Sequence, residues 1–192
     1  MSTIAFMTEQ GKRSDQEDRC LAQQFSMNGR YAWLLAVFDG HGGSATSEYC
    51  RAKLLDYLTS SNAKDVPQAL SAAIKRLAQE TCSKQPGTTL SAVCIFDDVA
   101  TAAVIGDSPI IMEDAAGNVW HSPKHNVGTN KVERAAAVAC GAHYEHGYIS
   151  LHRYSEGLQL SRALGDASLR RILSDVPEIH EMPSPSFVVI AS

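Results

Sequence analysis

The feature that most constrains this chain is a glycine-rich turn that directly follows an apolar strand. Residues 31–38 read Y-A-W-L-L-A-V-F, a run of the length typical of a buried strand, and residues 39–43 read D-G-H-G-G. The strand would place Asp39 and His41 at one point of a rigid scaffold. The three glycines permit backbone conformations closed to other residues, and they let a metal ion or a phosphate approach main-chain groups such as those of Gly40.

Charged residues upstream of the turn extend its chemistry. Glu17 and Asp18 add carboxylates, and Arg13 adds a planar cation suited to bidentate contact with phosphate. His41 can donate a proton near neutral pH. Acids for a divalent metal, an arginine for phosphate and a histidine for a leaving group together indicate metal-assisted hydrolysis of a phosphate ester. The alternative is a structural α+β protein in which the Asp-Gly turn is only a turn and the acids are solvated surface groups.

Composition restricts the partners and the compartment. With 192 residues, 44% of them hydrophobic, the chain is expected to form a single domain over residues 1–192. A net charge of −4 leaves no basic footprint for nucleic acid, and the chain lacks an apolar run of about eighteen residues, so no nucleic-acid or membrane partner is predicted. Five widely spaced cysteines without a C-x-x-C motif and no visible signal peptide favour an intracellular protein, cytoplasmic or nuclear. A monomer is expected.

Apolar periodicity and turn signals predict a layered α+β fold rather than a parallel βαβ sheet. Strands are expected at residues 3–8, 19–25, 31–38, 88–96, 101–105, 110–113, 119–121, 144–149, 157–160 and 187–191, with a hairpin at Asn28-Gly29. Helices are expected at residues 45–58, from Val66 onward, at 131–140 and at 167–173.

Helical spacing also predicts which faces of the first two helices are buried. The helix from Val66 has one apolar stripe, formed by Leu70, Ala73, Ile74, Leu77 and Ala78. In the helix at 45–58 the corresponding residues are Tyr49, Ala52, Leu55 and Leu58.

Three further motifs could belong to the same site. Gly106-Asp107-Ser108 follows a predicted strand, so Asp107 could reach the same metal cluster, although this motif is also a common turn. Gly87-Thr88-Thr89 is either a plain turn or a support for the site. The run S-R-A-L-G-D at 161–166 places Arg162 and Asp166 on either side of a glycine bend, where they could form an internal salt bridge or an Asx-type turn.

Taken together, these motifs resemble the metal-dependent protein phosphatases of the 2C type, the PPM family. G-K-R-S-D-Q-E-D at 11–18 resembles the family's opening motif, and V-F-D-G-H-G-G at 37–43 is very similar to its second. G-T-T-L at 87–90, V-I-G-D-S at 104–108, L-S-R-A-L-G-D at 160–166, V-P-E-I at 176–179 and F-V-V-I-A-S at 187–192 follow in the family's order. The similarity spans nearly the whole chain.

The resemblance implies a fold, a reaction and a set of site residues. The fold would be a β-sandwich flanked by helices (αββα), and the reaction would be hydrolysis of phosphoserine and phosphothreonine in phosphorylated proteins by a metal-activated water. Two Mg2+ or Mn2+ ions, with a weaker third, would be held by Glu17, Asp18, Asp39, the Gly40 carbonyl and Asp107. Asp39, Arg13 and His41 would be the catalytic residues: Arg13 would hold the substrate phosphate and His41 would protonate the departing oxygen. Arg162 and Asp166 would be mainly architectural.

The chain departs from the family pattern at its last residue. After Ser192 the family continues with an Asp-Gly and later an Asp-Asn, so we expect a domain incomplete at its C-terminus, without the last strands and with one metal site weakened. Pro109 also stands where the family often has arginine. Two interpretations remain open: a truncated phosphatase, or a catalytically impaired short member that acts as a phosphoprotein-binding or regulatory module.

Overall fold

A long hairpin begins the fold and leads into the larger of two sheets. In the computed structural model, which describes residues 3–153 and 155–192, β1 (Arg19–Met27) and β2 (Arg30–Phe38) pair antiparallel around Asn28 and Gly29. Both turn residues have positive φ angles, of 52° and 75°, as an Asn-Gly hairpin requires. β2 pairs with β5 (Leu90–Phe96), β5 with β6 (Val99–Ile105), and β6 with β12 (Glu178–Pro183), giving a five-stranded antiparallel sheet.

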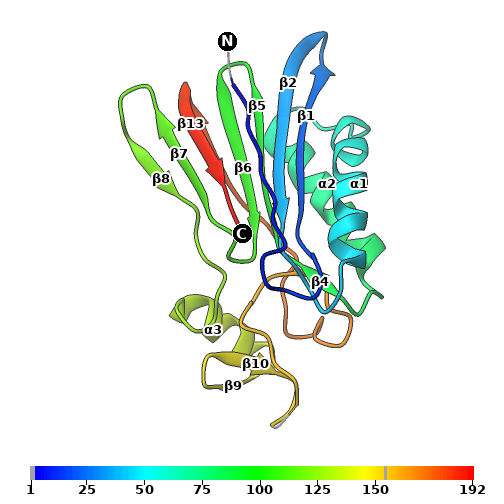
Figure 1. Cartoon of the computed structure of the whole chain (residues 1–192). Helices are drawn as coiled ribbons and strands as arrows, with labels where there is room; N and C mark the ends of the chain where they lie inside the picture. The colour runs from blue at the N-terminus through cyan, green and yellow to red at the C-terminus, as the bar shows by residue number, and fades with distance from the viewer. Residues whose placement is uncertain (1–2, 154) are drawn as a thin grey trace.

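A second, three-stranded sheet packs against one face of the first. It consists of β13 (Pro185–Ile190), β7 (Ile110–Asp114) and β8 (Val119–His121), in that order. Val93 and Val104 of the larger sheet are buried against Ile110 and Met112 of the smaller one. Because side chains alternate between the faces of a strand, the neighbouring residues of β5 and β6 point to the opposite face. The expected α+β sandwich is confirmed (Figure 1).

Two helices cover that opposite face of the five-stranded sheet. They are α1 (Ala45–Thr59) and α2 (Val66–Thr81), and both lie on the same side of the sheet in Figure 1. The α2 helix begins at Val66, as predicted. The Asp65 carboxylate caps it by accepting a hydrogen bond of 2.8 Å from the Gln68 N–H, and Pro67 occupies the first turn. No described helix is both long and apolar enough to cross a membrane.

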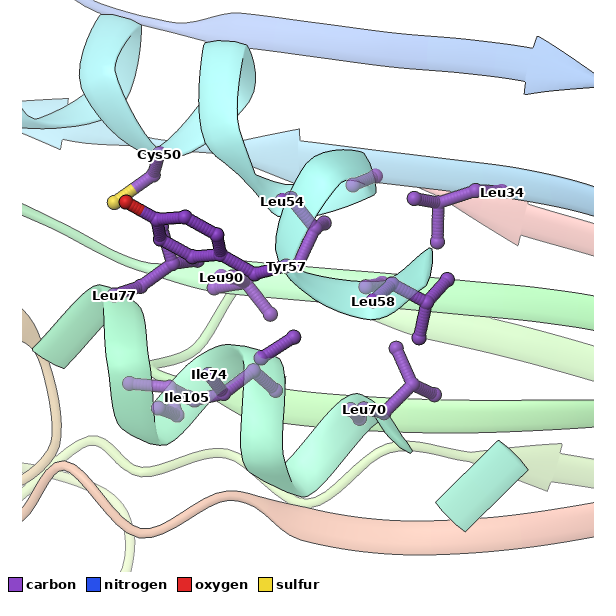
Figure 2. Close-up of a cluster of buried hydrophobic side chains, with 14 of the residues drawn as sticks. Leu34, Cys50, Leu54, Tyr57, Leu58, Leu70, Ile74, Leu77, Leu90 and Ile105 are labelled. Carbon is purple, nitrogen blue, oxygen red and sulfur yellow. The ribbon is translucent and has the colours of Figure 1, made fainter. Parts of the chain in front are cut away.

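The main core lies between these helices and the sheet. Figure 2 shows side chains from both helices and from the strands gathered in one cluster. The helices contribute Leu54, Tyr57, Leu58, Leu70, Ile74 and Leu77, and the strands contribute Leu34, Leu90 and Ile105. Most of these are fully buried, and each leucine or isoleucine stabilises the fold by about 1.5–3 kcal/mol relative to an exposed position. The stripe predicted for α2 is correct.

The stripe predicted for α1 is only partly correct: Leu58 is buried and Tyr49 and Leu55 pack half-buried against the core, but Ala52 is exposed. The buried residues of that helix are Thr46, Ser47, Cys50, Leu54, Tyr57 and Leu58, of which only Leu58 was expected. Two of these residues carry hydroxyl groups that donate to distant carbonyls. Thr46 Oγ1 donates to the carbonyl of Pro86 at 2.5 Å, and Ser47 Oγ donates to the carbonyl of Glu17 at 2.5 Å. Both hydroxyl groups are thus buried with their hydrogen bonds made, on the same face as Cys50, Leu54 and Leu58.

A small unit with its own apolar cluster lies at one end of the sandwich. It contains α3 (Lys131–Ala139) and the hairpin of β9 (His143–Glu145) and β10 (Tyr148–Ser150). The Asn130 side chain caps α3 by accepting from the Val132 and Glu133 N–H groups. Its cluster is built around Val127, Ala137, Ala142, Ile149 and Ile172.

A sheet of three very short strands joins the motifs singled out in the sequence. β3 (Gly40–His41) pairs with β4 (Gly87–Thr88), and β4 pairs with β11 (Leu164–Gly165). The sheet therefore places the D-G-H-G-G turn beside G-T-T, and G-T-T beside the run S-R-A-L-G-D. Neither β3 nor β11 has a local sequence pattern long enough to predict a strand, and β12 was not predicted either.

Several other predicted elements are corrected. Residues 3–8 form no strand; residues 3–6 instead line a groove of about 720 Å³ between β1, β2 and β13. Residues 157–160 make only isolated bridges, and the strand predicted at 144–149 is the β9–β10 hairpin. Residues 167–173 form no helix. They form successive turns, in which the N–H groups of Leu169 and Ile172 donate to the carbonyls three residues earlier. The strand predicted at 88–96 is interrupted at Thr89.

Candidate active site

The main chain of Asp39 is fixed where β2 ends. Its N–H donates to Thr89 Oγ1 at 3.0 Å, and its carbonyl accepts from the Thr89 N–H at 2.9 Å and from Thr88 Oγ1 at 3.1 Å. The motif G-T-T at 87–89 thus supports the site instead of forming a plain turn. Because these bonds all involve the backbone of Asp39, its carboxylate is left available for other partners.

Pairing in the hairpin brings two more acids to the same place. Arg19, the first residue of β1, lies opposite Phe38, the last residue of β2, so Glu17 and Asp18 emerge beside Asp39. The contact is tight: a Cβ added to Gly40 would overlap the Glu17 carbonyl oxygen. Glycine is therefore required at this position by packing alone.

A fourth acid reaches the group from β6. This strand ends at Ile105, opposite Leu90 of β5, and Gly106 turns the chain with a φ of +98°. Asp107 follows, and its Oδ2 accepts a hydrogen bond of 2.8 Å from Asn126 Nδ2. Asn126 was not identified from the sequence, because an asparagine in a loop gives no local signal of the acid that it contacts.

The electrostatics of Asp39 show how close these carboxylates are. The pKa of Asp39 rises from an ordinary 3.8 to about 6, first because the residue is half-buried and then because of the negative charges of Asp18 and Asp107 and a hydrogen bond to Asp18. Asp18 also accepts from Ser192 Oγ at 3.1 Å, so the chain after β13 reaches the same group. We call Glu17, Asp18, Asp39 and Asp107 the acidic cluster.

The chemistry of these donors fits a hard divalent cation. The acidic cluster and the Gly40 carbonyl offer only oxygen atoms, which Mg2+ and Mn2+ prefer. Burial is the main cause of the raised pKa of Asp39, followed by repulsion from Asp18 and Asp107, and the charge of His41 offsets this rise only in part. A bound divalent ion would remove that repulsion.

His41 is held by an acid that the sequence did not single out for this purpose. Its Nε2 lies 2.8 Å from Asp166 Oδ2 and 3.0 Å from Oδ1. Burial would lower the pKa of His41, but the hydrogen bond to Asp166 and the charges of Asp166, Asp39 and Glu17 outweigh it and raise the pKa above its usual range. Asp166 therefore interacts with a residue of another strand and does not only stabilise its own loop.

Arg13 stands apart from these contacts. It is exposed, in a turn where its N–H donates to the Gln10 carbonyl at 3.3 Å and its own carbonyl accepts from Gln10 Nε2 at 2.8 Å. Its guanidinium makes no hydrogen bond or ion pair with any residue that the structure describes. A free guanidinium on an exposed turn near Glu17 is available to a ligand, but the structure does not bring it into contact with the acidic cluster.

A second acidic group, away from this cluster, is already neutralised by an arginine. His125, Glu133 and Glu178 lie close enough together to share a cation. Arg162 occupies that position: its Nη2 is 2.6 Å from Glu133 Oε1 and 2.9 Å from Glu178 Oε1. His125 Nδ1 accepts from the Gly106 N–H at 3.1 Å, so its remaining nitrogen carries the proton. This group is an internal salt-bridge network and not a metal site. The predicted salt bridge between Arg162 and Asp166 is wrong, because Arg162 pairs with Glu133 and Glu178 while Asp166 contacts His41.

The fold and the acidic cluster define a class of protein: an antiparallel α+β sandwich with a group of acidic residues at one end of its strands. Comparisons with known proteins identify the family. The family described as Protein phosphatase 2C matches residues 2–192. The chain therefore belongs to the protein phosphatase 2C family, whose members are metal-dependent protein serine/threonine phosphatases.

Individual relatives agree with this assignment. The chain is 31% identical over 170 residues to "Probable protein phosphatase 2C 69" of Oryza sativa subsp. japonica, which covers 78% of this chain and 40% of the relative. It is 27% identical over 204 residues to "Probable protein phosphatase 2C 11" of Arabidopsis thaliana, covering 99% of this chain and 53% of the relative. The chain thus spans about half the length of the curated relatives it matches.

Solved structures share the fold. The crystal structure of serine-threonine phosphatase 2C from Toxoplasma gondii superposes with a TM-score of 0.80 at 21% identity, covering 96% of this chain and 75% of that chain. The structure of a C. elegans sex determining protein gives a TM-score of 0.74 at 25% identity, covering 92% of this chain and 47% of that chain.

Proposed function

We propose that this chain hydrolyses phosphoserine and phosphothreonine in phosphorylated proteins, with Mg2+ or Mn2+ as cofactor. The observation that carries the proposal is the acidic cluster, whose residues flank the ends of β1, β2 and β6: Asp18 and Asp107 act on the charge of Asp39, and Glu17 and Asp39 act on that of His41. Family membership supports the reaction class. The repulsion of Asp39 by Asp18 and Asp107, which the charge of His41 offsets only in part, supports a cation at this place.

Each residue has a proposed role. Glu17, Asp18, Asp39, the Gly40 carbonyl and Asp107 would hold the cations. Bound divalent ions supply an activated water and offset the charge of the phosphate. Arg13 would clamp the substrate phosphate, since its guanidinium is unpaired among the described residues and suits bidentate contact. His41 would protonate the departing seryl or threonyl oxygen, because an alkoxide is a poor leaving group.

The test is a comparison of activity and ion binding in the same protein. Hydrolysis of a phosphothreonine peptide and of p-nitrophenyl phosphate is measured with Mn2+, with Mg2+ and with EDTA, and titration calorimetry counts the Mn2+ ions bound. We expect metal-dependent turnover that is lost in Asp39→Asn. A folded protein that hydrolyses neither substrate would overturn the proposal, and Mn2+ binding without turnover would favour the phosphoprotein-binding alternative.

A further inference from the structure

Asp166 holds His41 through a register that the three short strands impose. His41 of β3 lies opposite Gly87 of β4, and Gly87 lies opposite Gly165 of β11. Asp166 directly follows Gly165, with a φ of +47° that turns its side chain back across the sheet. Two residues 125 positions apart in the sequence therefore meet across a single glycine.

Both side chains pack directly against Gly87, where there is no room for a larger residue. A Cβ added to Gly87 would overlap both Asp166 Oδ2 and His41 Nε2, so the histidine and the carboxylate lie directly on the backbone of β4. The Asp166 side chain is 8% exposed and that of His41 is 26% exposed. A contact that is buried, rigid and charged is well suited to fix the orientation of an imidazole.

The contact also determines which nitrogen of the neutral His41 ring carries the proton. Both carboxylate oxygens lie within 3.0 Å of Nε2, so Nε2 must be the donor, since a bare nitrogen would face two oxygen acceptors. Nδ1 makes no hydrogen bond with the described residues. Nδ1 of His41 is not among the buried side-chain atoms of those residues that lack a hydrogen-bond partner, so it is open to solvent.

We infer that Asp166 is a positioning residue that binds the Nε2 proton of His41 and thereby makes Nδ1 the atom that delivers a proton to the departing oxygen; this rests on the proposed function. As the water oxygen bonds to phosphorus, the bond from phosphorus to the seryl or threonyl oxygen breaks, and that oxygen takes the Nδ1 proton. The imidazole is left neutral, with Nε2–H still bonded to Asp166. The proton released by the attacking water, passed through solvent, restores Nδ1–H.

The kinetic test compares two substrates that differ in their need for a proton. A threonyl oxygen needs one to leave, whereas p-nitrophenolate leaves readily without one. We expect Asp166→Asn to lower kcat for a phosphothreonine peptide by about 100-fold and to change kcat for p-nitrophenyl phosphate little. The control is Asp175→Asn, an exposed acid in the same region, which should match the wild type on both substrates. Equal losses on both substrates, or none, would overturn the inference.

A second measurement needs neither a variant nor activity. Long-range 1H–15N spectra of the wild-type protein without metal report which nitrogen of His41 carries the proton in the neutral ring. We expect the Nε2–H form, and a spectrum showing Nδ1–H with a bare Nε2 would contradict the inference. If the wild type hydrolyses neither substrate while the spectra show Nε2–H, the proposed function fails but the assignment of Asp166 to Nε2 stands.

Discussion

Replacing Asp39 with asparagine should stabilise the metal-free protein while abolishing metal binding. Asparagine has nearly the shape of aspartate, and the hydrogen bonds at this residue that hold the turn to Thr88 and Thr89 come from the backbone, so they survive the change. What disappears is a negative charge that burial and the neighbouring carboxylates of Asp18 and Asp107 disfavour. The stability gained and the function lost have the same cause.

The magnitude follows from the pKa of Asp39. A value of about 6 in the folded protein, against 3.8 for the free side chain, means that the folded state keeps a proton that the unfolded state has released between these pH values. The free energy of unfolding of the wild type therefore falls as pH rises from about 4 through 6. The full difference is about 3 kcal/mol, and solvent screening of a half-buried side chain reduces it to about 1–2 kcal/mol.

The assay is urea unfolding in EDTA at several pH values between 4 and 8, followed by the same series with Mn2+. Asp39→Asn should equal the wild type near pH 4 and exceed it above pH 6.5, whereas Mn2+ should stabilise only the wild type. Asp175→Asn serves as the control, because it removes an exposed charge outside the cluster. An Asp39→Asn protein that is less stable than the wild type at pH 7.5 in EDTA, or one that Mn2+ stabilises equally, would refute this reasoning.

Three further predictions test other parts of the structure. Gly40→Ala should destabilise the fold by about 1–3 kcal/mol in thermal melts, because its Cβ has no room; unchanged stability would contradict the packing described here. Arg162→Leu should cost about 3–5 kcal/mol in urea unfolding, since it leaves the buried Glu133 carboxylate unpaired, and a neutral effect would disprove the network. Burial raises the pKa of Cys50 and Cys94 to about 12, so a thiol reagent at pH 8 should modify only the other three cysteines until the chain unfolds.

Local signals in the sequence were enough for the elements that depend on local interactions. The Asn28-Gly29 turn, the apolar run that became β2 and the start of α2 at Val66 each depend on interactions within a few residues. The apolar stripe of α2 is correct because one helical period decides which face is buried. The D-G-H-G-G motif likewise indicated a candidate site, since its glycines permit backbone conformations around His41 that are closed to other residues.

Features that only the tertiary structure decided depend on residues that are distant in the sequence. The buried face of α1 includes the hydroxyl groups of Thr46 and Ser47, whose acceptors lie 40 and 30 positions away. Strand pairing across Gly87 placed Asp166 on His41, and two-residue strands have no period that a sequence can reveal. The sequence by itself therefore determined which residue types the site contains, whereas the register of three short strands decided which of them touch, because hydrogen-bonded pairing between remote segments leaves no local trace.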